Sequence, residues 1–390
     1  MRFLAIFSNP YRDGSTISTL ETIKGLKRRG VDVLVMVKEE GFLTEELKKL
    51  YIPYNIIPLP FWQMPFHNSM ADVFKFLPRV LKILWREKLA IKRLNVIVRD
   101  WKPDIIYTNV SVIDVGYKAA KKNHIPHLWH IREYGDLDFN IHPLTGVKRR
   151  LKKLSSSYSV CITNDLKNYN HLGINSEVIY NIIKRDNLSV QYQKEKTIIF
   201  VGRVTENKGA TEALKGFIEF SKLNPEYKLE FLGRCNDPNY KERLVNLINK
   251  ENVSDKVFFI GQISDIAERM QRASAIIVAS KSEGFGRITA EAMLNHCLVI
   301  GRNTAGTKEQ LDNGFNLWGK EIGVRYESFD GLVASLNKLA KMDKTEYEEI
   351  AKRAEDTVER LYNPQIHLDK LCSFLDKILK KRLKGNNFNR

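Results

Sequence analysis

The chain has 390 residues, of which 43% are hydrophobic and 28% are charged, a composition typical of a globular protein with two or three domains. No run of 18 apolar residues occurs, so we expect no transmembrane helix. The four cysteines include no CxxC pair and no metal-ligand spacing, so we expect reduced thiols in a cytoplasmic protein and no structural zinc site. These cysteines are Cys161, Cys235, Cys297 and Cys372.

The formal net charge of +17 is distributed unevenly. Residues 1–190 contain 30 Lys and Arg against 18 Asp and Glu, an excess of +12, which leaves 33 against 28, or +5, for the remainder. A cytoplasmic protein this basic usually binds an acidic partner, and the candidates are nucleic acid, anionic lipid and phosphorylated substrates.

Apolar, β-branched segments alternate with amphipathic helical segments along the first half of the chain. The segment RFLAIFS is too short for the core of a signal peptide and passes directly into a turn, so we expect a first buried strand. Further strands are predicted at VDVLVMV, DIIYTNV, HLWHIRE, YSVCITN and EVIYN, with helices over residues 16–30 and 114–123 between them. This alternation is typical of a parallel α/β sheet.

The pattern stops in the polar residues 181–196 and then restarts, with strands predicted at TIIFVGR, YKLEFLG, KVFFIG, AIIVAS and CLVIG. We therefore predict an α/β protein of two Rossmann-like doubly wound domains, residues 1–185 and 196–362, that face each other across a cleft. Residues 363–390 break at Pro364 and predict a final helix. Ligands of such sheets bind beyond the carboxyl ends of the strands.

The first candidate site follows the strand TIIFVGR. Gly202 and Arg203 end this strand. Lys208 and Gly209 precede a helix that is expected to start at about residue 210. Two cations beside a glycine-bearing turn and a helix N-terminus suit a diphosphate, because backbone N–H groups and the helix dipole add to the side-chain charge. A solvated loop with incidental basic residues is the alternative.

The second candidate site is the segment KSEGFGRITAEA, residues 281–292. Its glycines allow a ligand to approach the backbone closely, and a helix from about Arg287 offers N–H donors to phosphate oxygens. A carboxylate accepts paired hydrogen bonds from vicinal hydroxyls, so Glu291 is a candidate for holding a ribose and Glu283 for holding a hexose. Glu291 could instead only complement the helix dipole, but this explains one acid and not both.

The segments VGRVTENKG, FFIGQIS, SEGFGRITAEAM and GRNTAGTKE, in this order, resemble the retaining GT-B glycosyltransferases of family four, the glycosyl transferases group 1, of the bacterial surface polysaccharide type. Glu283 and Glu291 match both acids of the E-x7-E motif of that family. In the N-terminal half the resemblance rests on the opening strand and loop, on IPHLWHIREYGD and on VIYNII. This half departs from the family pattern at Asp13-Gly14-Ser15, where Gly-Gly is common, and at Asn181, which precedes isoleucine instead of glycine.

The resemblance implies a role for each matching residue. Arg203 and Lys208 resemble the diphosphate-binding pair, Glu291 the acid that holds the ribose, and Glu283 the acid beside the donor sugar. The backbone from Gly261 to Ile263 resembles the nucleobase contact. In this family the last helix often crosses back to the first domain, so we expect the helix of residues 363–390 to return to it. The implied nucleotide-sugar-binding residues are Gly14, Gly202, Arg203, Lys208, Gly261, Gln262, Ile263, Gly284, Phe285, Gly286, Arg287 and Glu291, and the implied catalytic residues are Glu283, His130, Arg203 and Lys208.

His130 resembles the histidine that hydrogen-bonds the sugar in this family. A core histidine at a strand end is the alternative, and His124 and His127 lie close enough in sequence to be confused with it.

The implied reaction is independent of metal and uses no protein nucleophile. As the glycosidic bond breaks, negative charge grows on the β-phosphate, and Arg203, Lys208 and the backbone of residues 284–287 stabilise it. The acceptor hydroxyl attacks from the face that the diphosphate leaves, so configuration is retained. The DLD sequence at Asp136 to Asp138 resembles the metal-binding DxD of the other major glycosyltransferase fold, but it lacks the single-domain setting.

Residues 75–102 contain nine basic residues against two acidic ones, interleaved with Leu, Ile, Phe and Trp, and residues 147–154 add five cations. A basic amphipathic helix of this kind suits the surface of an anionic membrane. An ordinary surface helix with a solvated basic face is the alternative. Nucleic-acid binding is disfavoured because no recognised module accompanies the charge.

We therefore expect a hexosyltransferase-type enzyme that moves a sugar from a nucleoside diphosphate, a UDP-sugar first among the candidates, to a glycan acceptor. The acceptor is expected to be lipid-linked, during capsule or exopolysaccharide assembly at the cytoplasmic face of the cell membrane. A GT-B sugar-nucleotide epimerase would show further acid/base carboxylates and lack the E-x7-E pair. A non-catalytic partner subunit would have lost part of the set Arg203, Lys208, Glu283 and Glu291, which is intact.

Overall fold

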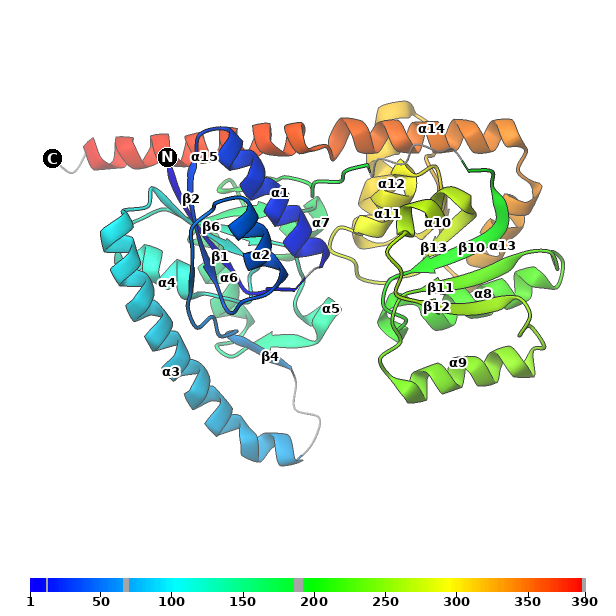
Figure 1. The fold of residues 1–390 in the computed structure, drawn as a ribbon, viewed down its shortest axis with the longest axis horizontal. Coiled ribbons are helices and arrows are strands. Elements are labelled where there is room, and N and C mark those ends of the chain that lie inside the picture. Colours follow the sequence, from blue (N-terminus) through cyan, green and yellow to red (C-terminus); the bar gives the residue numbers. More distant parts are fainter. Residues whose placement is uncertain (12, 66–69, 186–191, 388–390) are drawn as a thin grey trace. The chain divides into compact units, whose positions relative to one another are not determined.

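The computed structural model describes residues 1–11, 13–65, 70–185 and 192–387 (Figure 1). Contacts divide the chain into two compact units. Unit 1 contains residues 1–182 and 364–390, and unit 2 contains residues 183–363. Each unit is an α/β layer structure around its own parallel sheet, so each is described by itself.

Unit 1 is built on a seven-stranded sheet with the order β3-β2-β1-β5-β6-β8-β9, in which every pair is parallel. Its strands are β1 (Arg2–Phe7), β2 (Asp32–Val37), β3 (Tyr54–Ile56), β5 (Ile105–Asn109), β6 (His127–Ile131), β8 (Tyr158–Cys161) and β9 (Ser176–Val178). Phe3 lies opposite Val33 on one side and Ile105 on the other. Residues 3–7 are all buried, because helices cover both faces of the central strand, and this explains the continuous apolar run in the sequence.

The helices of unit 1 include one that arrives from the far end of the chain. They are α1 (Gly14–Arg28), α2 (Phe42–Lys49), α3 (Met70–Trp101), α4 (Val115–Lys122), α5 (Asp136–Phe139), α6 (Val147–Ser155), α7 (Asn164–Tyr169) and α15 (Pro364–Asn387). Figure 1 shows α15 running beside α1. A Cβ atom added to Gly25 would lie 2.2 Å from a methyl carbon of Leu368, so glycine permits this close packing. The predicted return of the last helix to the first sheet is confirmed.

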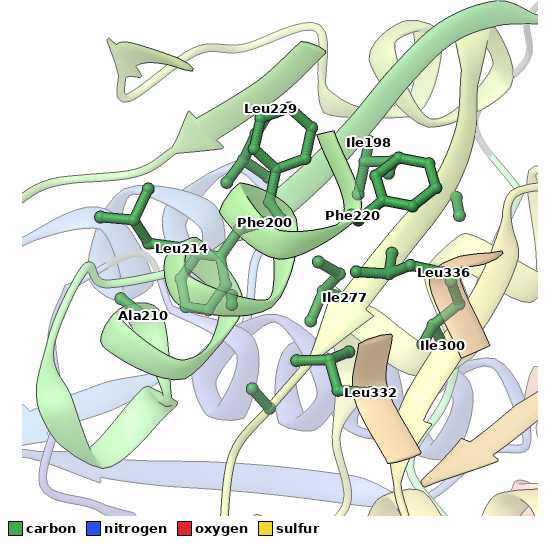
Figure 2. Packing of buried hydrophobic residues seen from close by; sticks show 14 of the residues in the cluster. Ile198, Phe200, Ala210, Leu214, Phe220, Leu229, Ile277, Ile300, Leu332 and Leu336 are labelled. Atoms are coloured by element: carbon green, nitrogen blue, oxygen red, sulfur yellow. The ribbon is translucent and has the colours of Figure 1, made fainter. Parts of the chain in front are cut away.

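Unit 2 is built on a six-stranded parallel sheet with the order β12-β11-β10-β13-β14-β15. Its elements are β10 (Glu195–Val201), the 3₁₀ turn η1 (Glu206–Lys208), α8 (Ala210–Ser221), β11 (Lys228–Leu232), α9 (Pro238–Lys250), β12 (Val257–Gly261), α10 (Ile266–Arg272), β13 (Ala273–Val278), α11 (Arg287–Leu294), β14 (Leu298–Arg302), α12 (Ala305–Trp318), β15 (Val324–Tyr326), α13 (Phe329–Lys341) and α14 (Lys344–Leu361). Figure 2 shows Phe200, Leu214 and Leu332 in the core that β10, α8 and α13 share.

The long strands that the sequence predicts are all present, and the α/β fold class is confirmed. The strands β3, β4 (Gln63–Pro65), β7 (Ile141–Pro143) and β15 were not predicted. Each has three residues, which is too short for a periodic signal. The strands β4 and β7 form a separate antiparallel pair in unit 1.

The strand order reverses direction between β1 and β5 in unit 1 and between β10 and β13 in unit 2. Such switch points are where open α/β sheets bind ligands, because the loops that leave the two strands separate there. In unit 2 the loops after β10 and β13 are residues 202–209 and 279–286. These are the two segments that the sequence singled out as candidate sites.

The interior of unit 1 contains a buried carboxyl group at Glu133, just after β6. The backbone N–H and the hydroxyl of Ser111 donate to its Oε1 at 2.5 and 2.8 Å. Burial nevertheless raises the pKa of Glu133 to about 7, since the surrounding protein disfavours the charged form. Its ordinary pKa is 4.5, so the folded chain retains this proton over a pH range in which the unfolded chain releases it.

We therefore expect Glu133 to stabilise the fold fully below about pH 4.5 and to lose that contribution as pH rises to about 7. Relative to wild type, Glu133→Gln should gain about 3 kcal/mol of unfolding free energy between pH 4.5 and pH 8. Denaturant unfolding of both proteins across this range measures the difference, with the exposed Glu177→Gln as control. A constant difference between wild type and Glu133→Gln would show that Glu133 has the same pKa in the folded and unfolded chains.

Candidate functional site

The loops after β10 and β13 are packed directly against each other. Gly209 has a left-handed backbone (φ +76°), and a Cβ atom there would lie 2.4 Å from the carbonyl oxygen of Ala279. The N–H of Gly202 donates to the carbonyl of Leu232 at 2.9 Å. At Gly209 a larger residue would force the loops apart, so glycine is required there by both conformation and space.

The two loops are joined by an ion pair between predicted site residues. Lys208, at the end of η1, donates from Nζ to Oε2 of Glu283 at 2.6 Å. The side chains are 29% and 26% exposed, so solvent reaches the pair. Ion pairs at this exposure contribute about 0–1 kcal/mol to stability. A diphosphate carries more negative charge than one carboxylate, so it can displace Glu283 from Lys208.

A second ion pair lies in the same segment, on helix α11. Arg287 and Glu291 are i and i+4 on α11, and their closest N···O distance is 2.8 Å. The helix starts at Gly286, which has a left-handed backbone (φ +77°) as the N-cap residue. Both members of this pair are partly buried, at 19% and 28% exposure, so Arg287 in the first turn of α11 holds the carboxylate of Glu291 in place.

Hydrogen bonds from α12 hold the turn that carries Glu283. Gln310 donates from its side-chain nitrogen to the carbonyls of Phe285 and, at 3.0 Å, of Gly286. The N–H of Gly306 donates to the carbonyl of Glu283 at 2.9 Å. Sequence reasoning gave no role to Gln310 or Gly306, although the segment GRNTAGTKE was among those that carried the resemblance.

The remaining predicted residues of unit 2 border the same edge of the sheet. Gly284 lies in the turn before α11, and Arg203 is exposed in the loop after β10. Gly261 ends β12 with a left-handed backbone (φ +83°) and open space around its Cα. Gln262 is exposed and Ile263 is partly buried in the following turn. Their roles stay predictions.

Gly14 and His130 belong to unit 1 and not to unit 2. Gly14 is the first residue of α1, and the preceding Asp13 caps the helix by accepting a 2.7 Å hydrogen bond from the N–H of Thr16. The capping aspartate explains how this loop forms a helix N-terminus without the glycine pair that is common in the family.

His130 is 1% exposed and lies in a hydrogen-bonded polar layer. Its Nδ1 contacts the hydroxyl of Tyr107 at 2.5 Å and a guanidinium nitrogen of Arg132 at 3.3 Å. Burial, reinforced by the nearby Arg132, lowers the pKa of His130 well below 6.5, so the ring is neutral. Because a guanidinium can only donate, Nδ1 is the acceptor and Nε2 carries the proton.

Nε2 of His130 is buried and has no hydrogen-bond partner among the residues that the structure describes. An orphaned buried donor costs about 1–3 kcal/mol, and such groups in native proteins mark positions that a ligand or water satisfies. The geometry is therefore compatible with the predicted sugar contact. His130 is also buried near the end of β6, as the alternative of a core histidine expects, so its role stays a prediction. His127 differs from it, because both ring nitrogens of His127 have partners, Thr108 and Ser157.

Arg132 organises this layer and was not predicted. Its side chain donates to Asn109 at 2.6 Å, to Asn181 at 2.6 Å and to Thr19 at 2.9 Å. These partners come from β5, from the segment after β9 and from α1, so one guanidinium links three parts of unit 1. Asn181 was noticed only as a departure from the family pattern, and no periodicity signals a contact between residues this far apart.

The DLD sequence after β6 has a structural role. The backbone N–H groups of Tyr134 and Gly135 donate to Asp138 at 3.0 and 2.8 Å, and the hydroxyl of Tyr169 donates to both oxygens of Asp136. No group of three His, Cys, Asp or Glu side chains arranged to hold a metal ion occurs within residues 1–11, 13–65, 70–185 and 192–387.

Comparisons with known proteins show what unit 2 is similar to. The sequence model of the family described as glycosyl transferases group 1 matches residues 184–357. The chain is 27% identical over 185 residues to an N-acetylgalactosamine-N,N'-diacetylbacillosaminyl-diphospho-undecaprenol 4-alpha-N-acetylgalactosaminyltransferase of Campylobacter jejuni, covering 45% of this chain and 49% of that protein. It is 25% identical over 184 residues to the capsular polysaccharide biosynthesis glycosyltransferase CapM of Staphylococcus aureus, covering 47% and 46%. The chain thus spans less than half the length of these curated relatives.

Solved structures match the whole fold. A complex of Anabaena Alr3699/HepE with UDP superposes with a TM-score of 0.76 at 15% identity, covering 97% of this chain and all of that one. A glycosyltransferase from Rickettsia africae gives a TM-score of 0.76 at 20% identity, covering 97% and 98%. At these identities the likeness concerns the fold. Residues 184–357 therefore match the glycosyl transferases group 1 family, and the fold of the chain is GT-B.

Proposed function

We propose that the protein is a retaining, metal-independent glycosyltransferase that uses a nucleoside-diphosphate sugar, first of all a UDP-sugar, as its donor. The observation that carries the proposal is the pairing of Lys208 with Glu283 and of Arg287 with Glu291 where the loops after β10 and β13 meet. These are two cations and two carboxylates at a helix N-terminus, the groups that a diphosphate linked to two sugars requires. The UDP complex of a structural relative supports the choice of base.

In the proposed complex the diphosphate replaces Glu283 as the partner of Lys208. The released carboxylate of Glu283 then accepts hydrogen bonds from the transferred sugar, while Glu291 accepts them from the ribose. As the glycosidic bond breaks, Arg203, Lys208 and the N-terminus of α11 stabilise the charge that grows on the β-phosphate. In unit 1, the neutral ring of His130 can donate from Nε2 to a sugar hydroxyl, which would supply the acceptor that this buried nitrogen lacks among the described residues.

The proposed acceptor is a glycan carried on a lipid during surface polysaccharide assembly. The name of the Campylobacter jejuni relative includes diphospho-undecaprenol, and that of CapM includes capsular polysaccharide biosynthesis. A lipid-linked acceptor would be met at a membrane surface, so the basic helix α3 becomes relevant to the same proposal.

Helix α3 has two halves with different surroundings. Ala90, Leu94 and Val98 in its second half are buried against unit 1. In the first half the large apolar side chains are instead exposed: Leu77 is 64%, Leu81 58%, Leu84 51% and Trp85 64% exposed. Figure 1 shows this half extending away from the sheet. The side chain of Phe74, which belonged to the predicted membrane segment, lies outside the described residues.

The exposed half of α3 carries cations among these apolar side chains, including the exposed Lys82 and Arg86. A structural surface helix buries its apolar stripe, whereas this stripe faces solvent. We propose that it docks on anionic membrane, helped by the basic helix α6. None of the helices over the described ranges is both long enough and apolar enough to cross a bilayer.

Replacing the proposed diphosphate ligands should lower turnover. Lys208→Ala and Arg203→Ala each remove a charge-assisted hydrogen bond of about 1.5–3 kcal/mol, so we expect turnover to fall at least about ten- to a hundredfold. Transfer from UDP-sugars, followed by release of UDP, measures this. Lys222→Ala removes a comparable Lys–Glu pair away from the site and is the matched control. EDTA should have little effect on wild-type activity. Full activity in both variants would contradict the assignment, and so would a loss of wild-type activity with EDTA that Mg²⁺ restores.

Substitutions of Glu283 and Glu291 should have different effects on nucleotide binding measured by calorimetry. Glu291→Ala should weaken UDP and the UDP-sugar alike, by about tenfold, because the ribose loses its acceptor. Glu283→Ala should keep or strengthen UDP binding, since it frees Lys208 from its intramolecular partner, while lowering turnover. Glu219→Ala, which breaks the exposed pair with Lys222, controls for general charge effects. Equal losses of UDP affinity in the two site variants would remove this division of roles.

Membrane docking should depend on charge and salt. Binding to vesicles should require anionic lipid and fall steeply from low to high salt, because each cation near the surface contributes about 1 kcal/mol and salt screens it. Changing Lys82, Arg86, Lys92 and Arg93 to Gln should reduce vesicle binding and leave transfer to a soluble acceptor nearly unchanged. The matched control changes four exposed lysines of unit 2 to Gln, namely Lys222, Lys338, Lys341 and Lys344. If the wild-type protein does not bind anionic vesicles at low salt, the docking proposal is wrong and α3 is an ordinary solvated helix.

A further inference from the structure

Unit 1 contains a cavity that none of the predicted site residues lines. It has a volume of about 210 Å³ and lies between the β4–β7 pair, α6, α7 and the segment after β6. The segment after β6 and α7 follow the carboxyl ends of β6 and β8, so the cavity borders the edge of the sheet where α/β folds bind ligands. Val147, at its rim, is 57% exposed, so the cavity reaches the surface.

Two residues that line the cavity each have a buried donor without a partner among the described residues. The side-chain nitrogen of Gln63 and the Nε of Arg150 are buried and form no hydrogen bond with any residue that the structure describes. The two side chains are only 3% and 5% exposed. Arg150 is held in place because one of its terminal nitrogens lies 3.4 Å from the hydroxyl of Ser111. Two orphaned donors in one small cavity indicate a ligand with hydrogen-bond acceptors.

Other residues that line the cavity supply an acceptor and aromatic surface. Asp136 accepts from the hydroxyl of Tyr169 at 2.5 and 2.6 Å, which orients its carboxylate. Burial, followed by the bond to Asp136, raises the pKa of Tyr169 to about 12, so the hydroxyl keeps its proton. The rings of Tyr134 and Tyr169 meet edge to face at 5.0 Å. The wall thus combines donors, an oriented carboxylate and an aromatic corner.

The charge balance disfavours an anionic ligand. The guanidinium of Arg150 is already influenced by the carboxyl groups of Glu133, Asp136 and Asp138. Of these, Asp136 also lines the cavity and would repel a phosphate or carboxylate directly. Hydroxyl groups both donate and accept, so a neutral polyol satisfies Asp136 and the two orphaned donors together.

We infer that this cavity binds one neutral sugar ring of the acceptor glycan. A volume of about 210 Å³ lies below the roughly 300–1,000 Å³ of sites for drug-sized molecules, so it admits a single ring and not a chain. The apolar C–H face of the ring packs on Tyr134 and Tyr169, and its hydroxyls bond Gln63, Arg150 and Asp136. The inference rests on the proposed function, because the sugar is identified as part of the acceptor.

Ligand-observed saturation-transfer NMR tests the cavity with methyl glycosides of neutral hexoses and N-acetylhexosamines, in the presence of saturating UDP. At least one glycoside should bind wild type. Its affinity should fall about three- to tenfold in Gln63→Leu and in Tyr169→Phe, since each change removes or misorients one hydrogen-bonding group. Tyr117→Phe is the matched control, because it removes a tyrosine hydroxyl that bonds Ser156 outside the cavity. Tyr169→Phe removes one oxygen from a partly exposed side chain, so we expect this variant to fold. It therefore tests the inference even if Gln63→Leu does not fold.

Three results would overturn the inference. The first is that UDP binds while no glycoside does. The second is that glycoside binding is lost in Glu283→Ala and kept in Tyr169→Phe, which places the sugar with the donor residues. The third is that inorganic phosphate binds to wild type and competes with the glycoside, with both signals lost in Tyr169→Phe. A chain that binds no UDP or UDP-sugar at all refutes the proposed function instead, so the two failures are distinguishable.

Discussion

The candidate donor site depends on the close contact between the loops that follow β10 and β13. Gly209 can lie against the carbonyl of Ala279 only because it has no side chain and a left-handed backbone. This contact brings Lys208 within 2.6 Å of Glu283, which is 75 residues away in sequence. The reversal of strand order between β10 and β13 puts the two loops next to each other, so sheet topology and one glycine determine the geometry of the charges.

The charges at this site satisfy each other inside the protein, and this has a functional consequence. An isolated lysine or glutamate at partial burial would carry a desolvation cost, whereas Lys208 with Glu283 and Arg287 with Glu291 each form a partly solvated pair. Such pairs contribute little net free energy, so exchanging a carboxylate partner for a diphosphate costs little. The ion pairs can thus keep the side chains in place before a ligand binds, and the cations can then exchange their carboxylate partners for the ligand.

Much of the fold and the local groups of the site could be predicted from the sequence, because strands, glycine turns and helix starts are encoded within a few residues. The residues that organise unit 1 could not. Arg132 joins Thr19, Asn109 and Asn181, and α15 completes the first core with Leu368 and its neighbours. These contacts link residues 23 to more than 300 positions apart, and nothing in a single sequence specifies such pairs. The strands β4 and β7 were missed for a different reason, because their three residues are too few to show a period.

The side chains with proposed roles are buried in different ways in the two units, and the difference matches those roles. In unit 2 the charged site residues are partly exposed and paired, as suits a donor whose diphosphate must exchange with product at every turnover. In unit 1 the donors of His130, Gln63 and Arg150 are buried, and each has an atom without a partner among the described residues. Neutral hydroxyl groups can satisfy such atoms without bringing charge into the interior. The burial pattern therefore favours charge recognition of the nucleotide by unit 2 and hydroxyl recognition of sugar by unit 1, a division that follows from the desolvation cost of each ligand.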